Sequence, residues 1–413
     1  MSQVVVLPGG FHSRIDSNSR QAMDQTIILF SNTSWYLYNF HSALAQSLRE
    51  AGYRVVMVAP RDQYTERLEQ AGFEFIQVDM RRSSLNPLRE LLLLRRIRKL
   101  LLREKPDIIV NFTIKCVVYG TFAGATVPGT GRVNAIAGLG SVFSGHNWQF
   151  RLLRLLLNNL LRLALKGTAN YTIVQNPDDQ RYLIDNQLVK PDQIHLIRGS
   201  GVDPEKFAPS GQCTVPVNTR PRVVFASRLL RPKGLFDFIG CAQRLNDRFE
   251  FVIAGEPDPG NPESISDLEL QHLVEQKVIS HLGQVDEMAI MLRQSHLVVL
   301  PSRYGEGVPR ILIEAAACGL PLVAYDTPGC REIVQDGING VLVKPADHQG
   351  LDQAILDILE DQPTYARMAQ ASRKLFLAEY TQQRVVEDTL KVVRRAASSA
   401  LSDHHADTES PFQ

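Results

Sequence analysis

Short apolar runs alternate with helical stretches along most of this chain, and that alternation limits its possible folds more than any other feature. Buried strands of a parallel sheet are continuous apolar runs, and connecting helices often end at glycine, as the stretch 40–51 does at Gly52. The strands expected in the first half are 26–31, 54–58, 73–78, 108–112, 132–137, 171–175 and 193–197. This half is therefore predicted to form a parallel α/β sheet.

The same alternation starts again after a linker at 208–221, which is rich in Pro, Gly, Thr and Ser. The strands expected after it are 222–226, 250–254, 278–282, 297–300, 322–325 and 340–343. A length of 413 residues fits two Rossmann-like, doubly wound α/β domains facing a central cleft, at 25–207 and 222–380. The remaining segments are expected to be a disordered extension (1–24), a C-terminal helix that can return to the N-terminal domain (381–397) and a disordered tail (398–413).

The net charge of +1 conceals three segments of different sign. Residues 1–80 have a net charge of −2, residues 81–177 of +12 and residues 178–413 of −9, and no Asp or Glu lies between Asp107 and Asp178. The total excludes a uniformly basic protein, but the middle segment favours an anionic membrane surface and a lipid diphosphate as partners. Nucleic acid is not expected, because no binding motif accompanies the charge.

The cysteines and the apolar runs indicate in which cellular compartment the protein is expected. Five unclustered cysteines (Cys116, Cys213, Cys241, Cys318 and Cys330) are typical of reduced thiols in a cytosolic protein. The N-terminus lacks the layout of a secretory signal, and no uncharged apolar run reaches the roughly 20 residues of a membrane-spanning helix. We expect a cytoplasmic protein that is peripheral on the cytoplasmic face of the membrane.

A cationic loop follows the first strand of the second half and contains Arg228, Pro232, Lys233 and Gly234. Pro232 can start a helix, which would place Lys233 at a helix N-terminus, where backbone N–H groups favour anions. The two cations can flank a diphosphate, which arginine can bind with two parallel hydrogen bonds. The alternative is that these are solvated loop charges.

A second loop follows the strand 297–300 and runs through Gly305, Glu306, Gly307, Val308 and Pro309 into a helix that contains Glu314. Glycine permits close approach of backbone and ligand, and Glu306 has no structural role in a helix. A carboxylate such as Glu314 near a helix start can accept from a ribose diol. The alternative for Glu314 is a glutamate that only complements the helix dipole.

These residues resemble a known family. Glu306 and Glu314 are similar to the paired-glutamate motif of the family 4 retaining glycosyltransferases, and Arg228 and Lys233 are similar to that family's diphosphate clamp. The resemblance runs from about residue 223 to residue 343 and implies the metal-independent GT-B fold of two Rossmann-like domains. It implies that the two cations neutralise the leaving diphosphate, that Glu306 contacts the transferred sugar and that Glu314 holds the ribose.

The donor of such an enzyme is a nucleotide diphosphate sugar. The resemblance implies that its binding residues are Arg228, Lys233, Gly255, Gly305, Gly307, Val308, Pro309 and Glu314, and that the catalytic residues are Glu306, Arg228 and Lys233. The carboxylates of Glu256 and Asp258 are the one candidate for a metal site after the strand 250–254. We interpret them as a loop near the nucleotide base, because the cation pair already supplies the charge; no metal and no cofactor are expected.

The loop 31–40 has aromatic and hydroxyl side chains where related transferases have glycines. Trp35 and Tyr36 can stack on a sugar and Asn32 can donate to it; the alternative is packing beneath a helix. This loop resembles, together with 111–120, 138–140 and 176–179, a subgroup that extends polyprenyl-diphosphate-linked saccharides in surface polysaccharide assembly. Lys115 and Tyr119 lie in the matched stretch and are candidate acceptor or donor contacts.

The chain departs from many family members at residues 136–138, where it has no histidine. His41 and His146 are interpreted as surface or packing residues, so no general base is assigned. A double displacement would need a carboxylate at the anomeric carbon, and residues 108–177 contain none. Attack on the same face as the departing phosphate, which takes the proton, fits this pattern better.

Two leucine-rich stretches, 81–105 and 148–166, carry most of the positive charge. In the second, Arg151, Arg154, Arg162 and Lys166 share one helical stripe beside a wide leucine face. A basic stripe with an apolar face suits a helix in a membrane interface, and the alternative is a domain helix whose leucines face the sheet.

The sequence thus predicts a retaining hexosyl- or N-acetylhexosaminyl-transferase that acts on a lipid-linked saccharide. One alternative is a sugar-nucleotide epimerase of GT-B fold, which would need acid and base carboxylates in the first domain. Another is a non-catalytic protein that binds the membrane surface.

Overall fold

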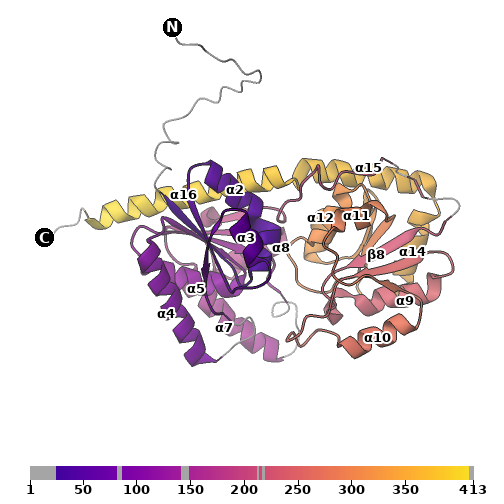
Figure 1. Cartoon of the computed structure of the whole chain (residues 1–413), viewed down its shortest axis with the longest axis horizontal. Helices are drawn as coiled ribbons and strands as arrows, with labels where there is room; N and C mark the ends of the chain where they lie inside the picture. The colour runs from indigo at the N-terminus through magenta and orange to yellow at the C-terminus, as the bar shows by residue number, and fades with distance from the viewer. Residues whose placement is uncertain (1–24, 81–85, 141–147, 212–213, 216–218, 409–413) are drawn as a thin grey trace, which may run out of the picture.

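The computed structural model describes residues 25–80, 86–140, 148–211, 214–215 and 219–408. In these residues the chain forms two α/β domains that lie side by side (Figure 1). The N-terminal sheet has seven parallel strands in the order β3-β2-β1-β4-β5-β6-β7. They are β1 (Thr26–Phe30), β2 (Arg54–Ala59), β3 (Glu74–Gln77), β4 (Ile108–Phe112), β5 (Gly131–Ile136), β6 (Asn170–Val174) and β7 (Ile194–Leu196).

The C-terminal sheet has six parallel strands in the order β10-β9-β8-β11-β12-β13. They are β8 (Arg222–Ala226), β9 (Glu250–Ala254), β10 (Ser280–His281), β11 (Leu297–Leu300), β12 (Leu322–Tyr325) and β13 (Gly340–Val343). The prediction of two doubly wound parallel sheets is confirmed, and each strand lies within two residues of its expected ends.

Helices cover both faces of each sheet. The N-terminal domain contains α1 (Ser34–Tyr36), the π-helix η3 (Leu37–His41), α2 (Ser42–Glu50), α3 (Thr65–Gln70), α4 (Pro87–Glu104), α5 (Ile114–Gly124), α7 (Trp148–Ala164), α8 (Pro177–Asp185) and the 3₁₀ turn η4 (Pro191–Gln193). After β8 come the 3₁₀ turn η5 (Arg231–Lys233), α9 (Leu235–Leu245), α10 (Asp267–Glu275), α11 (Met288–Arg293), α12 (Arg310–Ala317), α13 (Pro328–Ile333), α14 (His348–Leu359), α15 (Gln362–Glu379) and α16 (Gln382–Thr408).

Alternate side chains of β1 divide the N-terminal core between the two faces of its sheet. Ile27 and Leu29 pack with residues of α2, α3 and α16 on one face. Ile28 and Phe30 pack with residues of α4 and α5 on the other. Because β1 is buried on both sides, it appears in the sequence as an uninterrupted apolar run.

The strand order reverses next to β1 in the first sheet and next to β8 in the second. Ligands of doubly wound sheets bind beyond the carboxyl ends of the strands at such switch points. The loops after β8 and β11, which carry the predicted donor residues, therefore leave the sheet at adjacent positions.

Three predicted boundaries need correction. The first helical segment begins at Ser34 and not near residue 40, because the Thr33 side chain accepts from the Tyr36 N–H and caps it. Helix α16 continues past residue 397 to Thr408, because Ala396 and Ala400 are buried against the N-terminal domain. The chain also crosses between domains before residue 207, since Val202 and Phe207 belong to the core of the C-terminal domain.

Residues 1–24, 81–85, 141–147, 212–213, 216–218 and 409–413 lie outside the described residues. The predicted N-terminal extension, His146, Cys213 and the first residues of the basic stretch 81–105 fall there. In the described part of the chain, no helix is both long and apolar enough to cross a membrane.

Candidate functional site

The loops after β8 and β11 bring Lys233 and Glu306 into direct contact. Lys233 Nζ lies 2.6 Å from Glu306 Oε2, and the lysine side chain is only 10% exposed. Gly234 follows Lys233 with φ of +84°, and a Cβ there would lie 2.0 Å from the Pro301 carbonyl oxygen. Only glycine permits the two loops to approach so closely, and this approach places the cation beside the carboxylate.

Glu306 is held by a second partner, Ser302, whose Oγ donates to Glu306 Oε1 over 2.8 Å. The ring of Tyr304 lies beneath the Lys233 ammonium, 5.1 Å from its centroid to Nζ. A nearly buried cation beside a carboxylate and an aromatic ring can hold an anion and a hydroxylated ring together.

Arg228 does not join this pair. Its Nη1 lies 2.6 Å from Asp258 Oδ2, in the loop after β9, and the guanidinium is 42% exposed. Gly255 precedes that loop with φ of +130°, and a Cβ there would lie 1.9 Å from the Ser227 carbonyl oxygen. Gly255 therefore packs the β8 and β9 loops together, and Asp258 is the counter-ion of Arg228.

Glu314 lies in the second turn of α12 and is buried. Its Oε1 accepts from Arg310 Nε over 2.7 Å, and burial raises the pKa of its carboxyl group. Arg310 also reaches the N-terminal domain, where its Nη1 donates to Ser200 Oγ over 3.2 Å and its guanidinium lies 4.7 Å from the Phe40 ring centroid. The first-turn dipole role considered for Glu314 does not apply, because this glutamate pairs with arginine one turn earlier.

The glycines of the Glu306 loop contact the other domain. Gly307 N–H donates to the Ala137 carbonyl over 3.2 Å, and a Cβ on Gly307 would lie 2.1 Å from Gln175 Oε1. Val308 N–H donates to the same Gln175 oxygen over 3.1 Å, and Pro309 is the N-cap of α12. Gly305, Gly307 and Val308 thus meet protein where the sequence pattern led us to expect a ligand.

The predicted acceptor residues Asn32, Trp35 and Tyr36 lie near the start of the first helical segment. Trp35 is 39% exposed, whereas Tyr36 stacks on Phe40 with centroids 4.8 Å apart. Burial raises the pKa of Tyr36 to about 12. Tyr36 therefore packs beneath the helix, as the alternative interpretation held, while Trp35 keeps an open face.

Lys115 and Tyr119 share one face of α5 and meet Glu90 of α4. Lys115 Nζ lies 3.0 Å from Glu90 Oε2 and 5.8 Å from the Tyr119 ring centroid. Burial and the neighbouring Glu90 raise the pKa of Tyr119. The three side chains form one cluster after β4.

His41 packs on Phe112 with ring centroids 3.7 Å apart, as the packing interpretation of this histidine requires. Burial lowers its pKa to about 3, so the imidazole is neutral at physiological pH.

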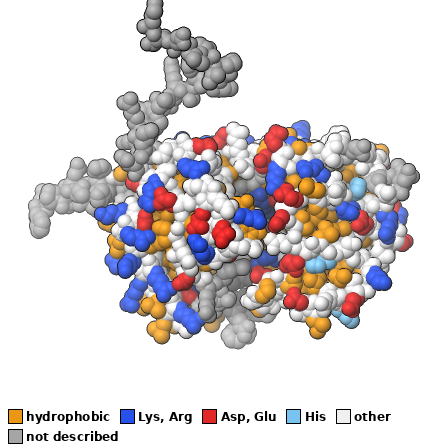
Figure 2. Space-filling view, viewed as in Figure 1, with side chains coloured by type: hydrophobic (Ala, Val, Ile, Leu, Met, Phe, Trp, Pro, Cys, Tyr) orange, Lys and Arg blue, Asp and Glu red, His pale blue; other side chains and the backbone are white. Residues whose placement is uncertain are grey.

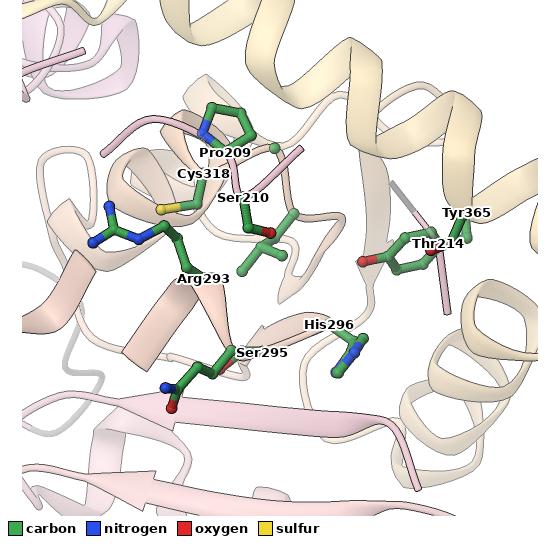
Figure 3. Close-up of a pocket in the computed structure, with 11 residues that line it drawn as sticks. Pro209, Ser210, Thr214, Arg293, Ser295, His296, Cys318 and Tyr365 are labelled. Atoms are coloured by element: carbon green, nitrogen blue, oxygen red, sulfur yellow. The ribbon is translucent and has the colours of Figure 1, made fainter. Parts of the chain in front are cut away.

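A pocket on the C-terminal domain lies away from these residues (Figure 3). Its lining includes Arg293, Ser295, His296 and Leu320, which precede β11 and β12. It therefore opens at the amino ends of the strands, on the opposite edge of the sheet from Glu306, and is not part of the candidate site.

Comparisons with known proteins identify the family. Residues 214–375 match the model of the glycosyl transferases group 1, and residues 40–199 match that of the glycosyl transferase 4-like domain. The chain is a family 4 glycosyltransferase. Both matched ranges lie in the two domains described above, and the predicted family resemblance is confirmed.

One relative of this glycosyltransferase matches over most of its length. It is the N,N'-diacetylbacillosaminyl-diphospho-undecaprenol alpha-1,3-N-acetylgalactosaminyltransferase of Campylobacter jejuni, 26% identical over 87% of this chain and 96% of the relative. Among solved structures, sucrose-phosphate synthase of Thermosynechococcus elongatus has a TM-score of 0.74 at 19% identity, covering 91% of this chain and all of that one. The Anabaena protein HepE in complex with UDP-glucose has a TM-score of 0.71 at 19% identity, covering 89% and 99%. The GT-B fold is thereby confirmed.

Several residues of the site escaped the assignment of roles from sequence. Gly138 and Gln175 contact the Glu306 loop from the N-terminal domain. Asp179 pairs with Asn176, whose amide also reaches the Glu306 carbonyl oxygen. The sequence could have indicated these residues by their position directly after β5 and β6, because the carboxyl ends of parallel strands lie at the same edge of the sheet.

Proposed function

We propose that this glycosyltransferase moves a sugar, with retention of anomeric configuration, from a nucleotide diphosphate sugar to a polyprenyl-diphosphate-linked saccharide. The observation that carries the proposal is the contact of Lys233 with Glu306 at the carboxyl ends of β8 and β11. The name of the Campylobacter relative, which has a diphospho-undecaprenol acceptor, supports the choice of acceptor.

The donor half of the proposal rests on the cations. Breaking the bond between sugar and diphosphate places negative charge on the leaving oxygen, which preorganised cations stabilise. Lys233 is nearly buried and can act there at low dielectric, whereas Arg228 is more exposed and can bind the outer phosphate oxygens. Glu314 would accept from the ribose, and the UDP-glucose complex of HepE makes UDP sugars the first donors to test.

Retention is proposed from the distribution of carboxylates. No Asp or Glu lies between Asp107 and Asp178, so the loops after β4 and β5 offer no carboxylate nucleophile. Glu306 already pairs with Lys233 and accepts from Ser302, which suits a residue that orients sugar hydroxyls. The acceptor hydroxyl would attack on the face from which the phosphate departs, and a phosphate oxygen would take its proton.

The acceptor half of the proposal rests on α4 and α7, together with Trp35 and the Lys115–Tyr119 cluster. Leucines of both helices are strongly exposed: Leu88, Leu91, Leu92 and Leu102 of α4, and Leu152, Leu153, Leu155, Leu156, Leu160 and Leu163 of α7. Figure 2 shows Lys and Arg side chains over the face where α4 lies. Leucines with basic neighbours fit an anionic membrane surface, and we propose that the enzyme works there on the cytoplasmic side.

The transfer reaction tests the proposal. Purified enzyme is incubated with UDP, GDP, dTDP and ADP sugars, with and without a polyprenyl-diphosphate-linked saccharide, and the anomeric configuration of the product is read by NMR. We expect transfer only with acceptor, and at least 100-fold lower kcat for Lys233→Ala and for Glu306→Gln. Arg231→Ala is the matched control, because Arg231 is a cation of the same turn that pairs with Glu269.

The alternatives predict other products. A donor epimerised in the absence of acceptor would replace the transferase proposal with the epimerase. Full activity in the Lys233 and Glu306 variants would refute the site.

A further inference from the structure

Two segments of the N-terminal domain contact the Glu306 loop: residues 137–140 after β5, and residues 175–179, which join β6 to the first turn of α8. We call these two segments the loop seat. Gly140 N–H donates to the Gly305 carbonyl over 3.0 Å, and Gly307 N–H donates to the Ala137 carbonyl over 3.2 Å. The backbone on both sides of Glu306 is therefore hydrogen-bonded to the other domain. Movement of the loop seat would move Glu306 relative to Lys233.

The contact leaves no free space. A Cβ on Gly138, whose φ is +100°, would lie 2.5 Å from the Gly307 nitrogen and 2.6 Å from the Glu306 carbonyl carbon. The two backbones touch, so a small displacement of either loop is transmitted to the other.

Asp179 connects the two halves of the loop seat. Its Oδ2 accepts from Asn176 Nδ2 over 2.9 Å, and its carboxylate is within hydrogen-bonding reach of the Leu139 backbone N–H. Asn176 Nδ2 also lies 3.3 Å from the Glu306 carbonyl oxygen. One carboxylate thus lies within reach of the segment after β5 and, through Asn176, is connected to the backbone of the proposed catalytic residue.

We propose that Asp179 is a positioning residue for Glu306, which in its ionised form keeps the loop seat against the Glu306 loop in the geometry needed for transfer. Asp179 acts on the Glu306 backbone through Asn176. The proposal rests on the proposed function of Glu306 and adds a residue of the N-terminal domain to the control of the donor site.

The charges around Asp179 determine how it titrates. Burial raises its pKa to about 6, and neighbouring Asp178 acts in the same direction. Asp178 pairs with Arg181 on α8 and lies 3.7 Å from Arg331 of α13. Residues 137–140 contain no titratable side chain, and across the contact Glu306 pairs with Lys233. A proton taken up as the pH falls through about 6 removes an acceptor from Asn176 or Leu139 and loosens the loop seat.

Steady-state kinetics distinguish a positioning role of Asp179 from a role in stability alone. Asp179→Asn keeps the shape of the side chain but replaces one acceptor oxygen with an NH₂ group, which would face either Asn176 Nδ2 or the Leu139 backbone N–H, both of them donors. With the UDP sugar that the wild type uses, we expect kcat to fall at least tenfold while the KM for that sugar and the affinity for UDP stay within twofold. The fall in wild-type kcat below about pH 6 should be absent from the variant. Asp178→Asn, which changes the adjacent, surface-paired carboxylate, should retain wild-type kcat at about pH 7.5, and its fall in kcat should begin at a lower pH because Asp178 no longer raises the pKa of Asp179.

Hydrogen exchange tests the same contact without turnover. In Asp179→Asn, the Gly307 and Val308 amides, which donate across the domain boundary, should exchange at least tenfold faster than in the wild type and in Asp178→Asn. Unchanged exchange there would overturn the proposal, as would faster exchange throughout the chain with a lowered Tm. Local acceleration in a protein that transfers no sugar would support the loop seat and refute the proposed function.

Discussion

At the residue scale, each proposed donor cation already has a carboxylate partner. Lys233 pairs with Glu306 and Arg228 with Asp258, so the donor diphosphate enters a site whose charges are balanced. A diphosphate that binds the cations competes with these carboxylates. Because Lys233 is the less exposed cation, its interaction with a phosphate oxygen is less screened by water than that of Arg228.

The sequence placed Arg228, Lys233 and Glu306 on neighbouring loops but did not predict the partner of each side chain. Arg228 and Lys233 could be proposed as diphosphate ligands because both follow a strand that ends at the switch point. Arg228 pairs with Asp258, 30 positions away, and Gln175 fills the space beside Gly307, 132 positions away. A local sequence pattern contains no information on contacts between residues so far apart.

Gly307→Ala tests the close contact between the domains. A Cβ would lie 2.1 Å from Gln175 Oε1, so the side chain or the loop must shift, and we expect a loss of about 1–3 kcal/mol in the free energy of unfolding together with lower kcat. Urea unfolding measures the first effect. In Gly240→Ala, on α9, the nearest atom is the flexible end of Arg244 at 3.3 Å, so stability should be kept or rise. Equal behaviour of the two variants would contradict the contact.

His41 predicts a pH dependence of stability. Its pKa is about 3 in the folded chain against an ordinary value of 6.5, so the unfolded chain binds the proton more strongly and stability is lost as the pH falls below 6.5. Between pH 7 and 5.5, the wild type should lose about 1 kcal/mol more than His41→Phe in denaturant unfolding. His272→Gln changes a histidine that is 81% exposed and should follow the wild type. A wild-type loss equal to that of His41→Phe would count against the neutral, buried imidazole.

At the element scale, burial explains which elements the sequence predicts well. Strands buried on both faces, such as β11 and β12, are continuous apolar runs, and their predicted ends agree with the structure to the residue. Helix α16 was placed too short, because its last turns contain Ser, Asp and His, whose composition resembles a tail. Tertiary packing stabilises the helix beyond its expected end at residue 397, since Ala400 is buried and Tyr171 is hydrogen-bonded to Ser399.

The leucine face of α7 can be tested by changing exposed side chains alone. Leu155 and Leu163 are 58% and 59% exposed, so replacing both with Gln should leave folding intact. Flotation with vesicles that contain phosphatidylglycerol should show about tenfold or more weaker binding, because each leucine loses about 1 kcal/mol of burial in the interface. Leu268→Gln on α10 removes a leucine that is 76% exposed on the other domain and should bind like the wild type. Undiminished binding of the α7 variant would exclude this helix from the membrane contact.

At the scale of the whole molecule, two chain crossings connect the domains and lie side by side. Val202 N–H donates to the Tyr380 carbonyl over 3.1 Å, and Gln382 N–H donates to the Val202 carbonyl over 2.9 Å. After the second crossing, α16 runs along the N-terminal domain, so the last described helix packs on the domain that contains β1 (Figure 1). The basic segment 81–177 thus lies in one domain, and the acidic excess of residues 178–413 lies mainly in the other.

This division of charge predicts how the molecule lies on a membrane. Arg89→Glu with Arg95→Glu on α4 should weaken binding to phosphatidylglycerol vesicles more than tenfold at 50 mM NaCl, since each basic group near the surface contributes about 1 kcal/mol. Lys344→Glu with Lys374→Glu makes the same change in net charge on exposed residues of the C-terminal domain and should have little effect. Raising NaCl to 500 mM should remove most of the difference, because the Debye length falls to a few ångströms. If both pairs weaken binding equally, net charge and not the α4 surface governs the attraction. If neither pair weakens binding, α4 is not part of the proposed membrane contact.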